Sequence, residues 1–139
     1  MSKLTNALIN HFNVSQLDLD KGETYQNRNG GRLEIILVNM GCLTEDDLAP
    51  LYCDVLEYPL FDSSQWNEWK PDKFPLEDLS FLKSKNWVLL QVIENSWVLA
   101  CKDPLDLDVI QYLQKRDVEA KIYVGTESEL QSFIFEIQA

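Results

Sequence analysis

The stretch RLEIILVNMGCLTEDDL, residues 32–48, decides how the first part of the chain folds, because it repeats an earlier stretch. Shifted by 29 residues, it aligns with KLTNALINHFNVSQLDL, residues 3–19, and the leading cation and the apolar positions recur. A hydroxyl followed three residues later by an acid recurs as well, at Ser15 and at Thr44, which is typical of a capped helix start. The repeat predicts one helix-turn-helix unit used twice.

The apolar residues of both copies recur at helical spacing, which indicates that each helix has one apolar face. Each face must be covered, and the nearest cover is the other copy, so we expect the four helices to form one cluster. Pro50 lies six residues after Thr44, so it should kink the second helix of its repeat or delay its start. The leucines expected in this core are Leu4, Leu8, Leu33, Leu37, Leu43 and Leu48.

The second part of the chain has a different period. After a proline-rich connector, residues 87–93 and 96–102 are β-branched and aromatic runs that predict a hairpin, and residues 119–125 predict a third strand. A helix should precede the third strand and another should follow it. The apolar stripe expected on the first of these helices comprises Leu107, Val109, Ile110 and Leu113.

The predicted fold class is therefore α+β. A helical half built from the two-fold helix-turn-helix repeat, residues 1–62, precedes a small ββαβα half, residues 63–139. We expect the two halves to form one compact domain, because 139 residues are about the length of a single domain.

Composition excludes several classes of partner. The net charge of −11 argues against direct binding to nucleic acid or anionic lipid, since both need a basic face. No apolar segment approaches the length of a membrane span, which argues against direct membrane insertion. The three cysteines are scattered and form no C-x-x-C pair, as in reduced cytosolic proteins, so we expect a cytoplasmic protein.

No constellation of catalytic residues is visible in the sequence. The single histidine, His11, has no neighbouring acid or nucleophile, and no G-x-x-x-x-G-K-[ST] phosphate loop occurs. The acids of TEDDL, residues 44–48, favour a helix N-terminus rather than a metal site. We therefore predict no catalytic residue, metal or cofactor; an unrecognised small enzyme is the least favoured reading, and a binding or assembly module the most favoured.

Two segments carry a resemblance to a known family. GGRLEIILVNMGCLTEDDLAPLYCDVLEYPLFD, residues 30–62, resembles the Arg-Leu-Gly, Leu-Thr-Glu and exit pattern of the N-terminal domains of type II secretion and type IV pilus assembly ATPases. VLACKDPLDLDVIQYLQ, residues 98–114, is similar to that family's strand ending in Asp-Pro and the helix start after it. With the first repeat unit, the resemblance runs from about residue 3 to 134.

The resemblance implies a cytoplasmic, non-catalytic N-terminal domain of a general secretion pathway protein E-like ATPase. In that family the domain joins the ATPase core to the cytoplasmic part of an inner-membrane platform protein, the L component, so the motor becomes peripheral to the inner membrane. For the docking surface we expect steering charges at Asp46, Asp47 and Asp54, and apolar anchors at Tyr52 and Tyr58.

The resemblance also implies an alternative. In some of these ATPases the domain binds cyclic di-GMP through two copies of an Arg-Leu-Gly…Gln motif. Here the matching residues are Lys3 and Gln26 in the first copy and Arg32 in the second. Glu34 stands where the second copy has glycine and Val55 where it has glutamine, and the added carboxylate opposes a dianionic ligand. Docking is therefore the leading hypothesis.

Overall fold

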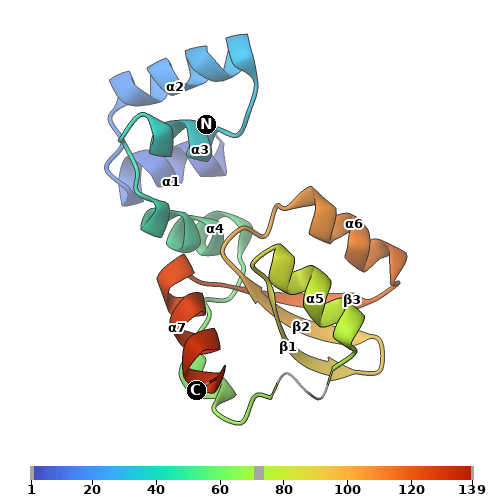
Figure 1. Cartoon of the computed structure of the whole chain (residues 1–139). Helices are drawn as coiled ribbons and strands as arrows, with labels where there is room; N and C mark the ends of the chain where they lie inside the picture. Colours follow the sequence, from blue (N-terminus) through green and yellow to red (C-terminus); the bar gives the residue numbers. More distant parts are fainter. Residues whose placement is uncertain (1, 71–73, 139) are drawn as a thin grey trace. The chain divides into compact units, whose positions relative to one another are not determined.

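The computed structural model describes residues 2–70 and 74–138, and Figure 1 shows their helices and strands. The chain divides into two compact units, residues 1–57 and residues 58–139. The first unit is helical, and the second combines helices with a three-stranded sheet. The predicted α+β class is therefore confirmed.

The described part of the first unit contains α1 (Lys3–His11), α2 (Gln16–Asn29), α3 (Leu33–Asn39), the 3-10 helix η1 (Glu45–Asp47) and α4 (Leu48–Leu56). The first two helices recur as α3 and as η1 with α4, which confirms the two-fold repeat. Ser15 Oγ accepts the Asp18 N–H at 3.1 Å. The Thr44 N–H donates to Asp47 Oδ2 at 2.9 Å. The same pattern of a hydroxyl and an acid thus begins the second helix of both copies.

Pro50 explains why the second copy begins with a 3-10 turn. A proline ring crowds the preceding turn, and its nitrogen donates no hydrogen bond, so it fits only in the first turn of an α-helix. Helix α4 begins at Leu48, which places Pro50 in that first turn, and the predicted delay is confirmed. The first copy has no such proline, and its α2 runs without interruption to Asn29, where Gly30 with φ of 78° ends it.

The leucines of the repeat form the core of the first unit. Helix α2 packs on α3, and α1 packs on α4. Gly22 allows the close approach of α2 to α3, because a Cβ at this position would lie 3.1 Å from Leu37 Cδ2. Leu4 is only half-buried. The other five predicted core leucines are buried: Leu8, Leu33, Leu37, Leu43 and Leu48.

The described part of the second unit contains η2 (Ser63–Trp66), α5 (Leu76–Ser84), β1 (Val88–Ile93), β2 (Ser96–Cys101), α6 (Leu107–Lys115), β3 (Glu119–Val124) and α7 (Glu127–Gln138). Strand β1 pairs antiparallel with β2, and β2 pairs parallel with β3. Helix α6 makes the crossover between the two parallel strands. The predicted ββαβα order is confirmed.

An apolar cluster covers each face of the sheet. Leu89 and Leu99 point toward the face where α5 and α6 pack. Val88 and Ala100 point toward the opposite face, where α7 packs. This alternation follows from the two-residue period of a strand. In the strand order β1-β2-β3, strands β1 and β3 are the edge strands of the sheet.

The first residues of the second unit pair with its sheet. The Phe61 N–H donates to the carbonyl of Val124 at 2.9 Å, and the Val124 N–H donates to the carbonyl of Pro59 at 3.0 Å. The sequence analysis assigned residues 58–62 to the helical half. Because this segment pairs with β3, the boundary between the compact units falls after Glu57 instead.

Leu107 departs from the predicted stripe of α6. Its exposed fraction is 70%, whereas Val109 and Leu113 are buried. Successive residues of a helix are about 100° apart, so Leu107 lies more than a quarter turn away from both buried residues. The expectation that Leu107 belongs to the apolar face was therefore wrong.

All four tryptophans lie in the second unit. Trp87 and Trp97 are buried on the face covered by α5 and α6. The ring of Trp66 meets the Tyr123 ring edge-on, with the centroids 6.1 Å apart. Trp69 Nε1 donates a hydrogen bond to the carbonyl of Leu89 at 2.7 Å. Trp69 therefore occupies a backbone acceptor on the outer edge of β1.

Candidate functional site

The acids predicted to steer a partner lie on or beside η1 and on α4. Asp46 is exposed. Asp47 is half-buried, and its carboxylate accepts the Thr44 N–H. The charge of Asp47 is thus engaged in capping its own helix, which leaves Asp46 as the more accessible of the two neighbouring acids.

The third predicted acid, Asp54, makes an exposed hydrogen-bonding contact with His11 that no local sequence pattern predicted. His11 Nδ1 lies 2.8 Å from Asp54 Oδ2, and the side chains are 61% and 42% exposed. The two residues are 43 positions apart, so no local pattern joins them. The packing of α1 against α4, which follows from the repeat, is the only signal that brings them together.

The predicted anchors need correction. Tyr52 is only 3% exposed, and its hydroxyl donates a hydrogen bond to Glu34 Oε2 at 2.8 Å. Because it is part of the core of the first unit, Tyr52 is not a surface anchor. Tyr58 is half-buried and is the first residue of the second unit. The structure therefore does not gather the predicted acids and tyrosines into one patch of the first unit.

The three residues predicted for cyclic di-GMP each have a partner within the first unit. Lys3 Nζ lies 3.4 Å from Glu57 Oε1. Gln26 Nε2 donates to the carbonyl of Gly31 at 3.1 Å. Arg32 precedes α3, and its Nε lies 3.8 Å from Glu34 Oε2. A nucleotide would have to displace these contacts to use the three side chains.

Glu34 is the residue that most distinguishes this site from the motif it resembles. It is 6% exposed, and the same Oε2 atom faces Arg32 and accepts the hydroxyl of Tyr52. A buried carboxylate requires such partners because it has lost its contact with water. The negative charge that a ligand phosphate would bring to Arg32 is thus already supplied by the neighbouring side chain.

A second buried carboxylate, Asp78 on α5, is fully shielded from solvent. It accepts hydrogen bonds from the hydroxyl of Tyr112 and from Nη2 of Arg116, both contributed by α6 or its end. Burial, followed by the hydrogen bond to Asp78, raises the pKa of Tyr112 to about 12. The three side chains join α5 to α6. No local sequence pattern predicts this cluster, because Tyr112 and Arg116 lie 34 and 38 residues after Asp78.

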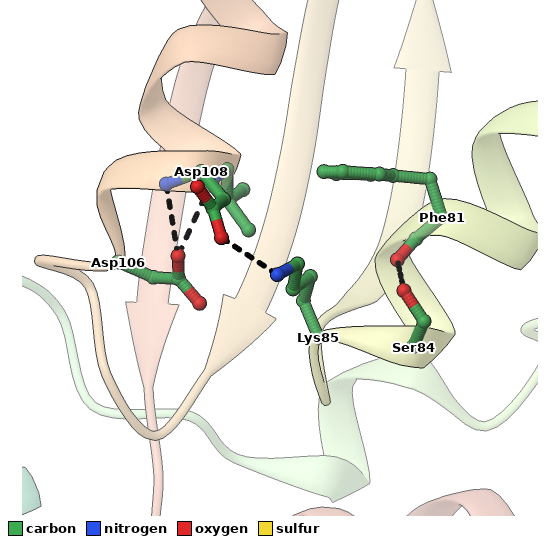
Figure 2. Close-up of polar contacts among 6 residues, drawn as sticks. Phe81, Ser84, Lys85, Asp106 and Asp108 are labelled. Atoms are coloured by element: carbon green, nitrogen blue, oxygen red, sulfur yellow. Dashed lines mark hydrogen bonds and ion pairs between the residues drawn. The ribbon is translucent and has the colours of Figure 1, made fainter.

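A third polar cluster lies at the other end of the same helix pair (Figure 2). Lys85 Nζ lies 2.7 Å from Asp108 Oδ2, and this hydrogen bond raises the pKa of Lys85. Asp106 caps α6 by accepting the Asp108 N–H at 3.0 Å. Asp103 likewise accepts the Leu105 N–H at 3.1 Å. The Asp-Pro and Leu-Asp pattern of residues 103–108 is therefore accounted for by a turn and a helix cap.

Within residues 2–70 and 74–138, no group of three or more histidine, cysteine, aspartate or glutamate side chains is arranged to hold a metal ion. Nor does that part of the chain contain a helix long and apolar enough to span a membrane.

Comparison with known proteins identifies a family and several structures of similar fold. The MshEN domain family matches residues 56–139, which is more than half of the chain. A solved structure of MshE with cdg is similar with a TM-score of 0.71 and 22% identity, covering 97% of this chain and 99% of that one. No curated protein matches the sequence.

The N-terminal domain of XpsE is similar in two crystal forms. One form has a TM-score of 0.66 and 24% identity, covering 96% of this chain and 92% of that one. The other has a TM-score of 0.58 and 25% identity, covering 95% of this chain and 92% of that one. The likeness therefore extends over both units.

Proposed function

We propose that this chain, which belongs to the MshEN domain family, is a non-catalytic docking domain that recruits a secretion ATPase to its membrane assembly. Its partners would be the ATPase core of the parent protein and the cytoplasmic part of an L-type inner-membrane platform protein. The domain would then work in the cytoplasm, peripheral to the inner membrane. The observation that carries the proposal is the family match over residues 56–139, which includes the resembling segment of residues 98–114.

The contacts of the first unit favour docking over ligand binding. Arg32 faces the buried carboxylate of Glu34, and Gln26 is bound to the carbonyl of Gly31. Removing either contact for a nucleotide costs a hydrogen bond or an ion pair that the ligand must replace. A protein partner needs no such exchange, because it can use the exposed surface.

Electrostatic steering should contribute to docking. The chain has a net charge of −11, and Asp46 is exposed on η1, directly before α4. A basic patch on the platform protein would therefore associate faster than a neutral one, and added salt would reduce the difference. Tyr58 remains the candidate aromatic anchor, because it is half-buried and retains some accessible surface.

Association kinetics test the proposal. We expect Asp46→Lys to slow association with the platform protein's cytoplasmic domain several-fold at low salt and to flatten its salt dependence. Glu94→Lys, an exposed change of the same charge in the β1–β2 turn, is the matched control and should leave the rate near that of the parent chain. If both variants slowed association equally, steering would depend only on the net charge of the chain, and Asp46 would have no specific place in the interface.

The second candidate function is binding of cyclic di-GMP. It is favoured by the structure of MshE with cdg, the abbreviation of that nucleotide, because the likeness covers 97% of this chain. Under this proposal Lys3, Gln26 and Arg32 would contact the ligand after leaving their present partners. A ligand that binds only the folded state at about 100 times its Kd raises the free energy of unfolding by about 2.7 kcal/mol. A rise in Tm with cyclic di-GMP would support this candidate, and the docking proposal predicts an unchanged Tm.

A further inference from the structure

An apolar groove with a volume of about 260 Å³ runs beside α5 in the second unit. One wall is formed by α5 and the other by Val88 and Leu89 of the edge strand β1, with Trp69 beside them. It is distinct from the Asp78 and Lys85 clusters, which lie on the side of α5 that meets α6. Of the polar contacts described above, the hydrogen bond from Trp69 Nε1 to the carbonyl of Leu89 joins two of its lining residues.

The α5 wall is a continuous helical stripe. Leu76, Leu79 and Lys83 are spaced at i, i+3 and i+7, so they share one face of the helix. This face extends over about 10 Å, the length of two helical turns. Leu76 is 79% exposed, which leaves its side chain available to a partner.

The opposite wall limits what kind of segment can bind. Because β1 is an edge strand, an added strand would need its outward backbone groups. The carbonyl of Leu89 already accepts a hydrogen bond from Trp69 Nε1 at 2.7 Å. Strand addition is thus blocked at the middle of the groove, and an occupant must bind through its side chains, as a helix does.

The charge at the groove specifies the occupant further. Lys83 is the only charged residue among the described residues that line it. It is exposed and has no ion-pair partner within the described part of the chain. An unpaired cation at the end of an apolar stripe, in a chain with a net charge of −11, is complementary to an acidic side chain.

We propose that this groove binds an amphipathic helix of the docking partner. Two apolar residues of that helix, three or four positions apart, would lie against Leu76, Leu79 and Trp69, and an acidic residue one turn further on would pair with Lys83. The inference rests on the proposed docking function and adds to it the surface that is used and the chemistry of the partner segment.

The second unit itself supplies matched controls. Leu76 and Leu107 are the first residues of α5 and α6, and they are 79% and 70% exposed. Lys83 and Lys115 lie in the last turns of the same helices. Asp at a helix start is compatible with the helix dipole, so Leu76→Asp and Leu107→Asp should both fold. Lys83→Glu and Lys115→Glu form the second pair.

The experiment is calorimetric titration of the whole chain with the cytoplasmic domain of the cognate platform protein. We expect Leu76→Asp and Lys83→Glu each to weaken binding about tenfold or more, as the loss of a central anchor does, while both α6 controls stay near the parent affinity. The partner's acidic residue that pairs with Lys83 can be changed to lysine. This change should restore binding to the Lys83→Glu variant, because it re-forms the ion pair with the charges exchanged, and it should not restore binding to the Leu76→Asp variant.

The outcomes separate the inference from the function on which it rests. Binding by the parent chain with equal affinity for the groove variants would overturn the groove and leave docking intact. No binding by the parent chain would overturn both. Self-association of the chain that Leu76→Asp abolishes, measured by sedimentation, would assign the groove to a second copy and would also overturn the inference.

Discussion

Each unit buries a carboxylate between a tyrosine hydroxyl and an arginine, but the two arginines are held differently. In the second unit, Arg116 donates a hydrogen bond directly to Asp78, which is fully buried. In the first unit, Arg32 approaches Glu34 only to 3.8 Å, an ion-pair distance that is too long for a hydrogen bond.

The difference separates a carboxylate that is hydrogen-bonded to its arginine from one that only faces its arginine. Asp78 links α5 to α6. This link stabilises the fold of the second unit and implies no ligand. Glu34 occupies a position at which the resembled motif has glycine, and its charge faces an arginine that the motif would offer to a ligand. In the second unit, the Asp78 cluster holds α5 against α6 while the groove on the other side of α5 stays open. In the first unit, Arg32 and Tyr52 both contact Glu34.

The largest expected effect is at Asp78. Asp78→Ala should lower the free energy of unfolding by about 3 kcal/mol, because it leaves the Tyr112 hydroxyl and the Arg116 guanidinium without their shared acceptor. Urea unfolding followed by tryptophan fluorescence measures it, since all four tryptophans lie in the second unit. A loss as small as that of an exposed control, Asp108→Ala, would contradict the role of Asp78.

A smaller loss is expected at Glu34. Glu34→Ala should cost about 2 kcal/mol, because the Tyr52 hydroxyl becomes a buried donor without an acceptor. Adding Tyr52→Phe to the same chain removes that donor and should recover part of the loss. Far-UV circular dichroism is the appropriate signal, since the first unit has no tryptophan. Additive losses in the double variant would show that the two groups are not coupled.

A third prediction concerns pH. The pKa of Tyr112 is raised to about 12 in the folded chain, above the unfolded value near 10, so its contribution is fully present below about pH 10 and is lost as the pH rises toward 12. Tyr112→Phe keeps the ring stacked on Phe81 and removes the titration. The stability difference between the two chains should therefore shrink between pH 10 and 12. A constant difference over that range would contradict the shifted pKa.

The smallest effect is expected at the exposed pair of Lys85 and Asp108. Lys85→Met should change stability only slightly, because the partners are 33% and 67% exposed and their attraction is screened by water and salt. Repeating the urea titration in about 1 M salt should remove the difference. A loss comparable to that of Asp78→Ala would overturn the distinction between the two ends of the α5–α6 pair.

Local patterns were sufficient to predict much of this fold. The hydroxyl and acid pairs at the starts of the second helices are read within one helical turn, and the structure uses both. The strands were predicted from their runs of β-branched and aromatic residues. Tyr52 was also predictable as a core residue, because it lies four positions after Leu48 and shares its buried helix face.

The remaining features depend on contacts between distant residues. The pairing of His11 with Asp54 spans 43 positions, and that of Asp78 with Arg116 spans 38. No periodicity in one helix reports which residue of another helix will face it. The open groove depends in the same way on where α5 meets β1, and the closed edge of β1 depends on a tryptophan from the connector.

Two titrations distinguish docking from nucleotide binding. The purified chain is titrated by calorimetry with the cytoplasmic domain of its cognate platform protein and, separately, with cyclic di-GMP. We expect saturable binding of the platform domain with a Kd of tens of micromolar or tighter, about −6 kcal/mol or more favourable, and no heat from the nucleotide. Saturable binding of the nucleotide with no binding of the platform domain would contradict the account.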